Sequence, residues 1–323
     1  MAKNLLNATM LITGGTGSFG TAFIDYLLSQ KEFKGIIRVF SRNESKQLAL
    51  QERFKNHPRL RYLIGDVRDL DRLILAMRGV NVVIHAAVLR QISTLEYNPF
   101  EAINTNIVGT QHVIRAAMST KVKRAVFISS GDVCSPTSLS GATKLTAEML
   151  FIQSNFYTNR TPRLSVIRYS NVFDNVDGFI PEFRRQKARN VISVADKNLT
   201  RFFITSRQGA EFSWNMIDVM KGGEIVVPKL PSVRISELAR VIAPRAELKT
   251  TGLKSGETLH ETLILPEEMK RTLEYRRYFL IQPNTPLPLW DVLKKTRHPR
   301  HGGYQSGDND RWLTNKTLRS ALS

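Results

Sequence analysis

A glycine-rich turn at residues 13–20 constrains the fold of this chain more than any other segment. It reads TGGTGSFG and lies between an expected strand at 9–13 and an expected helix at 21–29. Its glycines satisfy the spacing G-x-G-x-x-G, which lets main-chain N–H groups approach a pyrophosphate at the start of a helix. We therefore predict a dinucleotide-binding turn whose contacting residues are Gly14, Thr16, Gly17, Ser18, Phe19 and Gly20.

Short β-branched runs alternate with amphipathic helical stretches through the first half of the chain. The clearest helical patterns are at 21–29 and 100–118. The expected strands are 9–13, 36–40, 61–64, 80–85, 124–129 and 164–169. Strand and helix repeated in this way predict an α/β fold of Rossmann type, a doubly wound parallel sheet with helices on both faces.

The regular alternation ends after residue 169. One more strand is expected at 224–227, and a proline-punctuated tail follows it. We therefore expect the nucleotide-binding domain at 1–169, together with the strand at 224–227, and a smaller C-terminal substrate lobe at 170–222 and 228–323. Ligands of such sheets bind outside the carboxyl ends of the strands, so the lobe is expected to cover that edge.

The composition is that of an ordinary globular protein, with 42% hydrophobic and 23% charged residues. No apolar run approaches the ~18 residues of a membrane helix, and the first residues offer no signal peptide. A single cysteine, Cys134, excludes an intramolecular disulfide and fits a reducing compartment. We expect a cytoplasmic protein without a membrane span.

The chain carries a formal net charge of +19, from basic residues scattered along its length. A basic surface can bind nucleic acid, but the sequence has no helix-turn-helix signature, zinc spacing or aromatic-basic platform. The interpretation we favour is a solvated basic surface that partly serves anionic small molecules. The six histidines show no metal-ligand spacing, so we expect neither nucleic acid nor a metal.

The residues after the second expected strand bear on the choice between NAD and NADP. An NAD-selective site usually places a carboxylate here to accept the ribose 2′-hydroxyl. This chain has Ser41 and Arg42, with Lys46 one helical turn away, and a hydroxyl and cations suit a 2′-phosphate. Glu44 lies nearby and the same residues also fit a solvated helix start, but the pattern favours NADP. Further residues expected beside the cofactor are Asp66, near the adenine amine, and Val67, Ala86 and Ala87.

Several longer segments occur in the order of one known family across nearly the whole chain. They are TGGTGSFG at 13–20, FSRNESKQ at 40–47, GDVRD at 65–69, HAAVLRQ at 85–91, EYNPFEAINTNIVGT at 96–110, GATKL at 141–145, TRFFIT at 200–205 and GEIVVPKLPS at 223–232. With these segments the chain resembles the extended short-chain dehydrogenases. Among them it resembles the UDP-N-acetylglucosamine 4,6-dehydratases (inverting) of bacterial polysaccharide and flagellar-sugar pathways.

The resemblance implies a lyase that acts on a UDP-N-acetyl-hexosamine with a tightly held NADP. In that reaction hydride leaves sugar C4, the ketone acidifies the C5 proton, the 6-hydroxyl is eliminated and the hydride returns to C6. UDP-N-acetylglucosamine would thus become a 4-keto-6-deoxy sugar for surface polysaccharide or glycan biosynthesis. Members of the family are generally oligomeric, so the resemblance also implies a homo-oligomer.

The catalytic segments depart from the family pattern. The family reads S-T-D-K and then Y-G-A-T-K, where this chain reads S-S-G-D and then S-G-A-T-K. Lys144 is kept and, by resemblance, contacts the nicotinamide ribose. Ser140 replaces the tyrosine, Gly131 replaces an aspartate that acts as the acid, and Asp132 replaces a lysine that acts as the base. Asp132 is a candidate substitute base if burial raises its pKa, and otherwise a solvated loop carboxylate.

The resemblance also implies substrate contacts beyond the first sheet. The uridine-diphosphate clamp R-P-G-E-K reads K-S-G-E-T at 254–258, which keeps a cation but loses a bidentate donor. The candidate substrate-binding residues are Arg90, Asn171, Arg201, Lys254, Glu257 and Tyr304.

Three functions therefore stay open. The intact cofactor half, together with Lys144, Asn171 and Arg201, favours a 4,6-dehydratase. Loss of the family's acid, base and tyrosine favours a catalytically impaired NADP-binding relative, such as the partner subunit of an active paralogue. A nucleotide-sugar epimerase or keto-sugar reductase would need at least Ser130 and Lys144.

Overall fold

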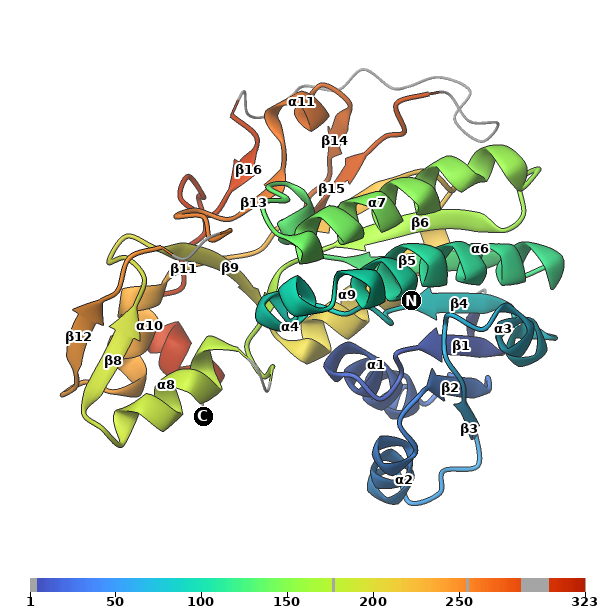
Figure 1. The fold of residues 1–323 in the computed structure, drawn as a ribbon, viewed down its shortest axis with the longest axis horizontal. Coiled ribbons are helices and arrows are strands. Elements are labelled where there is room, and N and C mark those ends of the chain that lie inside the picture. The colour runs from blue at the N-terminus through green and yellow to red at the C-terminus, as the bar shows by residue number, and fades with distance from the viewer. Residues whose placement is uncertain (1–4, 176–177, 254–255, 286–301, 323) are drawn as a thin grey trace.

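The computed structural model describes residues 5–175, 178–253, 256–285 and 302–322, which form two unequal parts (Figure 1). The larger part is built on a nine-stranded sheet with the order β14-β15-β10-β6-β5-β4-β1-β2-β3. Its strands are β1 (Met10–Thr13), β2 (Ile37–Ser41), β3 (Leu60–Ile64), β4 (Val82–His85), β5 (Arg124–Ser129), β6 (Arg163–Arg168), β10 (Ile225–Pro228), β14 (Thr272–Glu274) and β15 (Tyr278–Ile281). Neighbouring strands pair in parallel, except that β15 is antiparallel to both β10 and β14.

This sheet confirms the predicted Rossmann-type fold. Each strand expected from the sequence forms, with ends that differ by no more than two residues. The strand order reverses beside β1, as it does in dinucleotide-binding sheets. Met10, Leu11 and Ile12 of β1 are fully buried, as expected for a parallel strand that is covered on both faces.

Helices cover the two faces of the sheet. On one face α1 packs against α9, and on the other α6 contacts both α3 and α7. The helices of this part are α1 (Ser18–Ser29), α2 (Glu44–Arg53), α3 (Leu70–Met77), α4 (Ile92–Tyr97), α6 (Gly109–Ser119), α7 (Leu139–Gln153) and α9 (Ser206–Val219), with short 3₁₀ turns η3 (Gly131–Val133) and η4 (Ser154–Tyr157). Within the described ranges, none of the helices is long and apolar enough to cross a bilayer.

The helical stretch expected at 100–118 is divided into three segments. It consists of α5 (Pro99–Ala102), a π-helical segment η2 (Ile103–Val108) and α6. π segments inside α-helices are rare and often occur at functional sites. Here the wider turn carries Thr105 and Asn106, and both side chains are buried.

The smaller part of the molecule has a hydrophobic core of its own. Phe173, Phe183, Phe203 and Leu238 are buried in it. Its elements are β7 (Asn171–Val172), α8 (Phe179–Lys187), β8 (Val191–Val194), β9 (Thr200–Ile204), β11 (Ser232–Arg234), α10 (Ile235–Ile242), β12 (Glu247–Thr250) and α12 (Asn315–Leu322). Figure 1 shows this part on the side where β5 and β6 end. It therefore lies where the sheet is expected to bind its ligand.

The last strands of the chain lie in both parts. Strand β13 (Thr262–Ile264) pairs with β16 (Tyr304–Gln305), and α11 (Pro266–Met269) follows β13. Strands β14 and β15, from a segment assigned to the lobe on the sequence, extend the main sheet instead of the lobe. Each is three or four residues long, which is too short for a hydrophobic period to show where the strand belongs.

Candidate active site

The glycine turn lies between β1 and α1 and packs against the end of β4. Gly14 has a φ of +66°, and a Cβ there would lie 2.8 Å from the carbonyl oxygen of Ala86. A Cβ at Gly20 would lie 2.5 Å from the Cα of Gly15, so both positions require glycine. Helix α1 follows Gly17 without a side-chain cap. Its first N–H groups are thus suited to a phosphate.

Two adjoining clefts open around this turn. The larger, of about 800 Å³, extends to Lys144 on α7, and the smaller, of about 260 Å³, extends to Arg42 after β2. Every residue that was predicted to contact the cofactor lines at least one of them. These residues are Gly14, Thr16, Gly17, Ser18, Phe19, Gly20, Ser41, Arg42, Lys46, Asp66, Val67, Ala86, Ala87 and Lys144.

A buried hydroxyl supports the fit of a dinucleotide to these clefts. Thr105 Oγ1 has no hydrogen-bond partner in the described part of the chain, although the residue is only 4% exposed and lines the smaller cleft. A buried polar atom without a partner is costly, and a polar ring placed in this cleft would offer it one. The glycine turn and Thr105 together fit an adenine dinucleotide.

Asp66, which was predicted to lie near the adenine amine, lines the smaller cleft and is paired with two arginines. Its carboxylate lies 2.7 Å from Arg68 and 3.6 Å from Arg42. Burial raises the pKa of Asp66, but hydrogen bonds from Arg68 and the positive charge of both arginines outweigh it and lower the pKa. Asp66 is therefore ionised and holds two guanidinium groups at the mouth of the smaller cleft.

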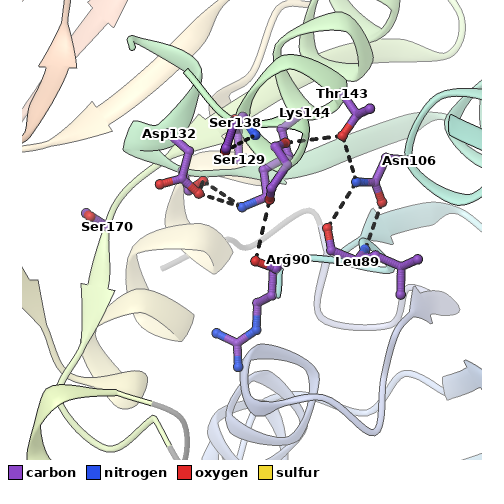
Figure 2. A network of polar contacts seen from close by, with 12 residues as sticks. Leu89, Arg90, Asn106, Ser129, Asp132, Ser138, Thr143, Lys144 and Ser170 are labelled. Atoms are coloured by element: carbon purple, nitrogen blue, oxygen red, sulfur yellow. Dashed lines mark hydrogen bonds and ion pairs between the residues drawn. The ribbon is translucent and has the colours of Figure 1, made fainter. Parts of the chain in front are cut away.

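Lys144 and Asp132 form the central polar contact of the site (Figure 2). The Lys144 ammonium donates to Asp132 Oδ2 at 2.7 Å and to Ser130 Oγ at 3.2 Å. Partial burial raises the pKa of Asp132, but the charge and hydrogen bonds of Lys144 and Ser130 outweigh it, so the pKa is lowered. Asp132 is thus ionised, and 53% of its side chain is exposed, so the raised pKa on which a role as substitute base depended is not found.

Asn106 holds the loop after β4 to the start of α7. Its side-chain carbonyl accepts from the Leu89 N–H at 2.7 Å, and its amide donates to the Leu89 carbonyl at 3.0 Å and to Thr143 Oγ1 at 3.0 Å. Figure 2 shows these contacts beside Lys144. No role was predicted for Asn106 from the sequence, although it lies in the segment EYNPFEAINTNIVGT. The π turn that places it has no recognisable sequence signal.

Two substituted positions of the family motif lie in crowded surroundings. Ser140 is 1% exposed, and its hydroxyl lies 3.5 Å from the carbonyl oxygen of Arg90. It was a candidate catalytic residue, but it does not line the two clefts around the turn or the cavity beside Asp132. A Cβ at Gly131 would lie 3.0 Å from the carbonyl oxygen of Thr262. Neither position has room for the larger family residue without a shift of its neighbours.

A third cavity, of about 520 Å³, lies next to the larger cleft. Of the residues predicted to bind substrate, Arg90, Arg201 and Glu257 line it, and Asp132 does too. Arg201 lies 3.6 Å from Glu257 and donates to the carbonyl oxygens of Thr200 and Leu259. Arg90 lines both this cavity and the larger cleft. The two spaces thus meet at Arg90 and at the Lys144–Asp132 pair.

The other predicted substrate contacts have different surroundings. Tyr304 is buried, because its hydroxyl exchanges hydrogen bonds with the main chain of Leu230 and its ring packs against Phe202 and Phe279. It is a core residue that joins the lobe to the sheet. The Asn171 amide donates to Glu261 and to the carbonyl oxygen of Phe202. Lys254 lies outside the described residues.

Glu261 also lines the third cavity, and no role was predicted for it from the sequence. Burial raises its pKa more than Arg201 and the hydrogen bonds of Ser170 and Phe202 lower it. A single glutamate before a short strand carries no signal in the sequence.

The described residues contain no group of three or more His, Cys, Asp or Glu that could bind a metal ion.

Fold and site together define a class of protein. A doubly wound sheet, a glycine turn at its reversal point and a lysine on the helix after the fifth strand are those of an extended short-chain dehydrogenase/reductase. The chain belongs to the polysaccharide biosynthesis protein family, whose sequence profile matches residues 10–283.

Individual relatives agree with this assignment. The chain is 38% identical to a UDP-N-acetylglucosamine 4,6-dehydratase (inverting) from Campylobacter jejuni (strain 81-176), over 97% of each chain. It is 35% identical to Pen from Bacillus thuringiensis, whose crystal structure matches with a TM-score of 0.86 over 98% of both chains. DesIV, a dTDP-glucose 4,6-dehydratase from Streptomyces venezuelae solved with NAD bound, shares the fold with a TM-score of 0.68 at 19% identity, over 78% of this chain and 86% of DesIV.

Proposed function

We propose that this chain is a nucleotide-sugar 4,6-dehydratase that acts on UDP-N-acetylglucosamine. The observation that carries the proposal is the ion pair of 2.7 Å between Lys144 and Asp132. Lys144 lines the cleft of the glycine turn, and Asp132 lines the third cavity. A dinucleotide and a sugar held in these two spaces would meet at this pair. Similarity along almost the full length of the Campylobacter dehydratase supports the substrate.

The cofactor in this proposal is NADP. Arg42 and Lys46 line the smaller cleft, next to the first turn of α2, where Asn43 caps the Lys46 N–H. Two cations and a helix start favour a 2′-phosphate over a bare hydroxyl. When bound, the nicotinamide supplies reversible hydride transfer. Lys144 would hold its ribose, and the glycine turn would hold its pyrophosphate.

The third cavity would hold the UDP-N-acetyl-hexosamine. Arg90 and Arg201 offer guanidinium groups to the diphosphate, and Glu257 accepts hydrogen bonds from sugar hydroxyls. Asp132, which is ionised beside Lys144, can take the C5 proton of a 4-keto sugar. Lys144 stabilises the Asp132 carboxylate before the transfer and keeps it oriented.

The test uses the purified full chain without added cofactor. We expect NADP to be identified by mass spectrometry in the protein as isolated. Incubation with UDP-N-acetylglucosamine should then give a 4-keto-6-deoxy sugar nucleotide that is detected by NMR, and Asp132→Asn should give none. Bound NAD in place of NADP would contradict the cofactor proposal. Bound cofactor without any product would contradict the dehydratase.

A second candidate function is a binding-only relative that acts as the partner subunit of an active paralogue. Two observations favour it: Ser140 is buried away from the described clefts, and Gly131 offers no side chain to the cavity. The same incubation separates the candidates, because a binding-only protein retains the dinucleotide and leaves UDP-N-acetylglucosamine unchanged.

We also infer a homo-oligomer, formed through α4, α5 and η2. Tyr97 and Phe100 are 89% and 78% exposed, and Ile92 and Ile103 next to them are also exposed. Exposed apolar side chains that gather in this way mark interaction surfaces. Phe100→Glu with Tyr97→Glu should lower the mass measured by light scattering to the 36.7 kDa of one chain. Leu48→Glu on α2, whose side chain is 54% exposed, should leave the mass unchanged, and a wild-type monomer would contradict the inference.

A further inference from the structure

A fourth cavity, of about 420 Å³, lies beside α3 on the face of the main sheet that β2 and β3 form. Its walls come from β2, β3 and α3 and from the residues just before β1 and β2, and they consist of Thr9, Ile36, Arg38, Arg61, Leu63, Arg72, Leu75 and Ala76. No residue of this set lines the two clefts around the glycine turn or the third cavity. The fourth cavity is therefore a separate space, and the proposed dehydratase reaction does not use it.

Two arginines leave the sheet side by side in the fourth cavity. Arg38 on β2 and Arg61 on β3 are partners in the parallel register of the two strands. Neighbouring strands are ~4.8 Å apart, so paired side chains start close together on the same face of the sheet. Arg72, in the first turn of α3, adds a third guanidinium group to the same cavity. Like charges that are brought together in this way repel each other.

No carboxylate of the described chain offsets these three charges. Among the residues that the structure describes, no aspartate or glutamate forms an ion pair with Arg38, Arg61 or Arg72 within 4.0 Å. By contrast, the nearby Arg68 contacts both Asp66 and Glu101 at 2.7 Å. An uncompensated group of charges conflicts with the rules that stabilise a fold, and such conflicts are expected at functional sites.

Main-chain carbonyl groups hold each of the three guanidinium groups by one nitrogen. Arg38 Nη1 donates to two carbonyl oxygens at the end of α3, at 2.7 and 2.8 Å. Arg61 Nη1 donates to two at the start of β3, at 2.7 and 2.8 Å, and Arg72 Nε donates to the last one of β3 at 2.8 Å. The other two nitrogens of each group have no hydrogen-bond partner among the described residues. Each arginine is thus oriented and still has donors for a ligand.

The chemistry of the walls indicates the kind of ligand. Guanidinium groups bind phosphate oxygens through paired hydrogen bonds, and three of them suit a ligand with more than one negative charge. Leu63 and Leu75 add an apolar wall, and the Leu75 side chain is 49% exposed. The volume is that of a site for a small molecule, whereas an extended polymer would need a longer basic surface.

We propose that the fourth cavity binds the diphosphate group of a small molecule between Arg38, Arg61 and Arg72. The site is distinct from the glycine turn, which would hold the pyrophosphate of the dinucleotide. Because it shares no residue with the proposed reaction site, its occupancy can be tested whether or not the chain is a dehydratase.

The test is titration calorimetry of the full chain with inorganic pyrophosphate, in the presence of NADP to occupy the glycine turn. Arg61→Gln should raise the Kd for pyrophosphate by ~10-fold or more, because a hydrogen bond to a charged group is lost. Arg72→Gln should have a similar effect from a different element. Arg61→Lys keeps the charge but not the fork of donors, so it should weaken binding less than Arg61→Gln does.

Thermal unfolding separates loss of the site from loss of the fold. Arg61 is exposed, and its replacement removes one of two repelling charges, so the thermal midpoint of Arg61→Gln without ligand should not fall. Pyrophosphate should raise the midpoint of the wild type and raise that of Arg61→Gln much less. Arg189→Gln, at an exposed position after α8, makes the same change in net charge and should bind pyrophosphate as the wild type does.

Three outcomes would overturn the proposal. The first is an equal Kd for pyrophosphate in the wild type and in Arg61→Gln. The second is an equal loss of affinity in Arg189→Gln, which would show that only the overall charge attracts the anion. The third is a single-stranded oligonucleotide that binds through Arg61 and Arg72 while pyrophosphate does not, which would assign the surface to a polymer.

Discussion

Replacing Lys144 by methionine is expected to lower turnover of UDP-N-acetylglucosamine by ~10²–10⁴-fold, the usual effect of losing a positioned acid–base group. The ammonium group is 6% exposed and donates to Asp132 and Ser130. Methionine keeps most of the volume of the side chain, so the loss reports the charge and its hydrogen bonds. Single-turnover kinetics with NMR detection of the product would measure it.

The same variant makes a prediction about pH. Lys144 lowers the pKa of Asp132, so its removal should raise that pKa towards or above the usual value. Because the proposed acceptor must be ionised, the acidic limb of the remaining activity should move to higher pH. Lys31→Met, at an exposed position after α1, should change neither rate nor profile. An unchanged acidic limb in Lys144→Met would contradict the coupling of Lys144 to Asp132.

Among the variants named, Arg168→Met is expected to lower the free energy of unfolding the most. Arg168 is 1% exposed, and its guanidinium donates to Glu148 at 2.5 Å, to Glu268 at 2.8 Å and to the carbonyl oxygen of Leu263 at 2.9 Å. Methionine would leave the buried Glu148 without its cation and Glu268 with only the more distant Arg271, at 3.8 Å. Breaking a buried pair in this way costs ~3–5 kcal/mol. Urea denaturation followed by circular dichroism would measure the fall in the free energy of unfolding.

The pH dependence of this loss has a definite sign. Burial raises the pKa of Glu268, but Arg168 outweighs it and lowers the pKa. The stabilisation is present above the pKa of an unfolded glutamate and is lost as pH falls through the lower pKa of the folded state. The difference between wild type and Arg168→Met should therefore shrink at acidic pH. Arg185→Met removes an exposed pair with Glu182 and should cost no more than ~1 kcal/mol.

Much of the fold and of the dinucleotide cleft could be predicted from the sequence. The parallel strands are continuous apolar runs, and the glycine turn requires its residues because a Cβ at Gly14 or Gly20 would overlap the main chain. Because these constraints act between residues that are close in sequence, the sequence alone predicts both the glycine turn and the kind of ligand that suits it. For this reason every residue predicted to face the cofactor lines the clefts around the turn.

The sugar side of the site was harder to predict, because distant contacts decide it. Ser140 was placed by a motif, but the first turn of α7 buries it under the loop of Arg90. Tyr304 was expected near substrate, but packing between the lobe and the sheet uses both its ring and its hydroxyl. Glu261 lies beside Gly131, although 130 positions separate them in the sequence, and no rule of residue spacing predicts such a contact.

The side chain of Asn106 links the two segments that would bind substrate and cofactor in the proposed reaction. Its amide group forms hydrogen bonds with both main-chain groups of Leu89 and with the hydroxyl of Thr143. Arg90 follows the first segment directly, and Lys144 follows the second. In the proposed reaction, a shift of Arg90 towards a diphosphate would therefore be transmitted through Asn106 to Lys144, so that binding of the nucleotide and alignment of the proton-transfer groups would be a single movement.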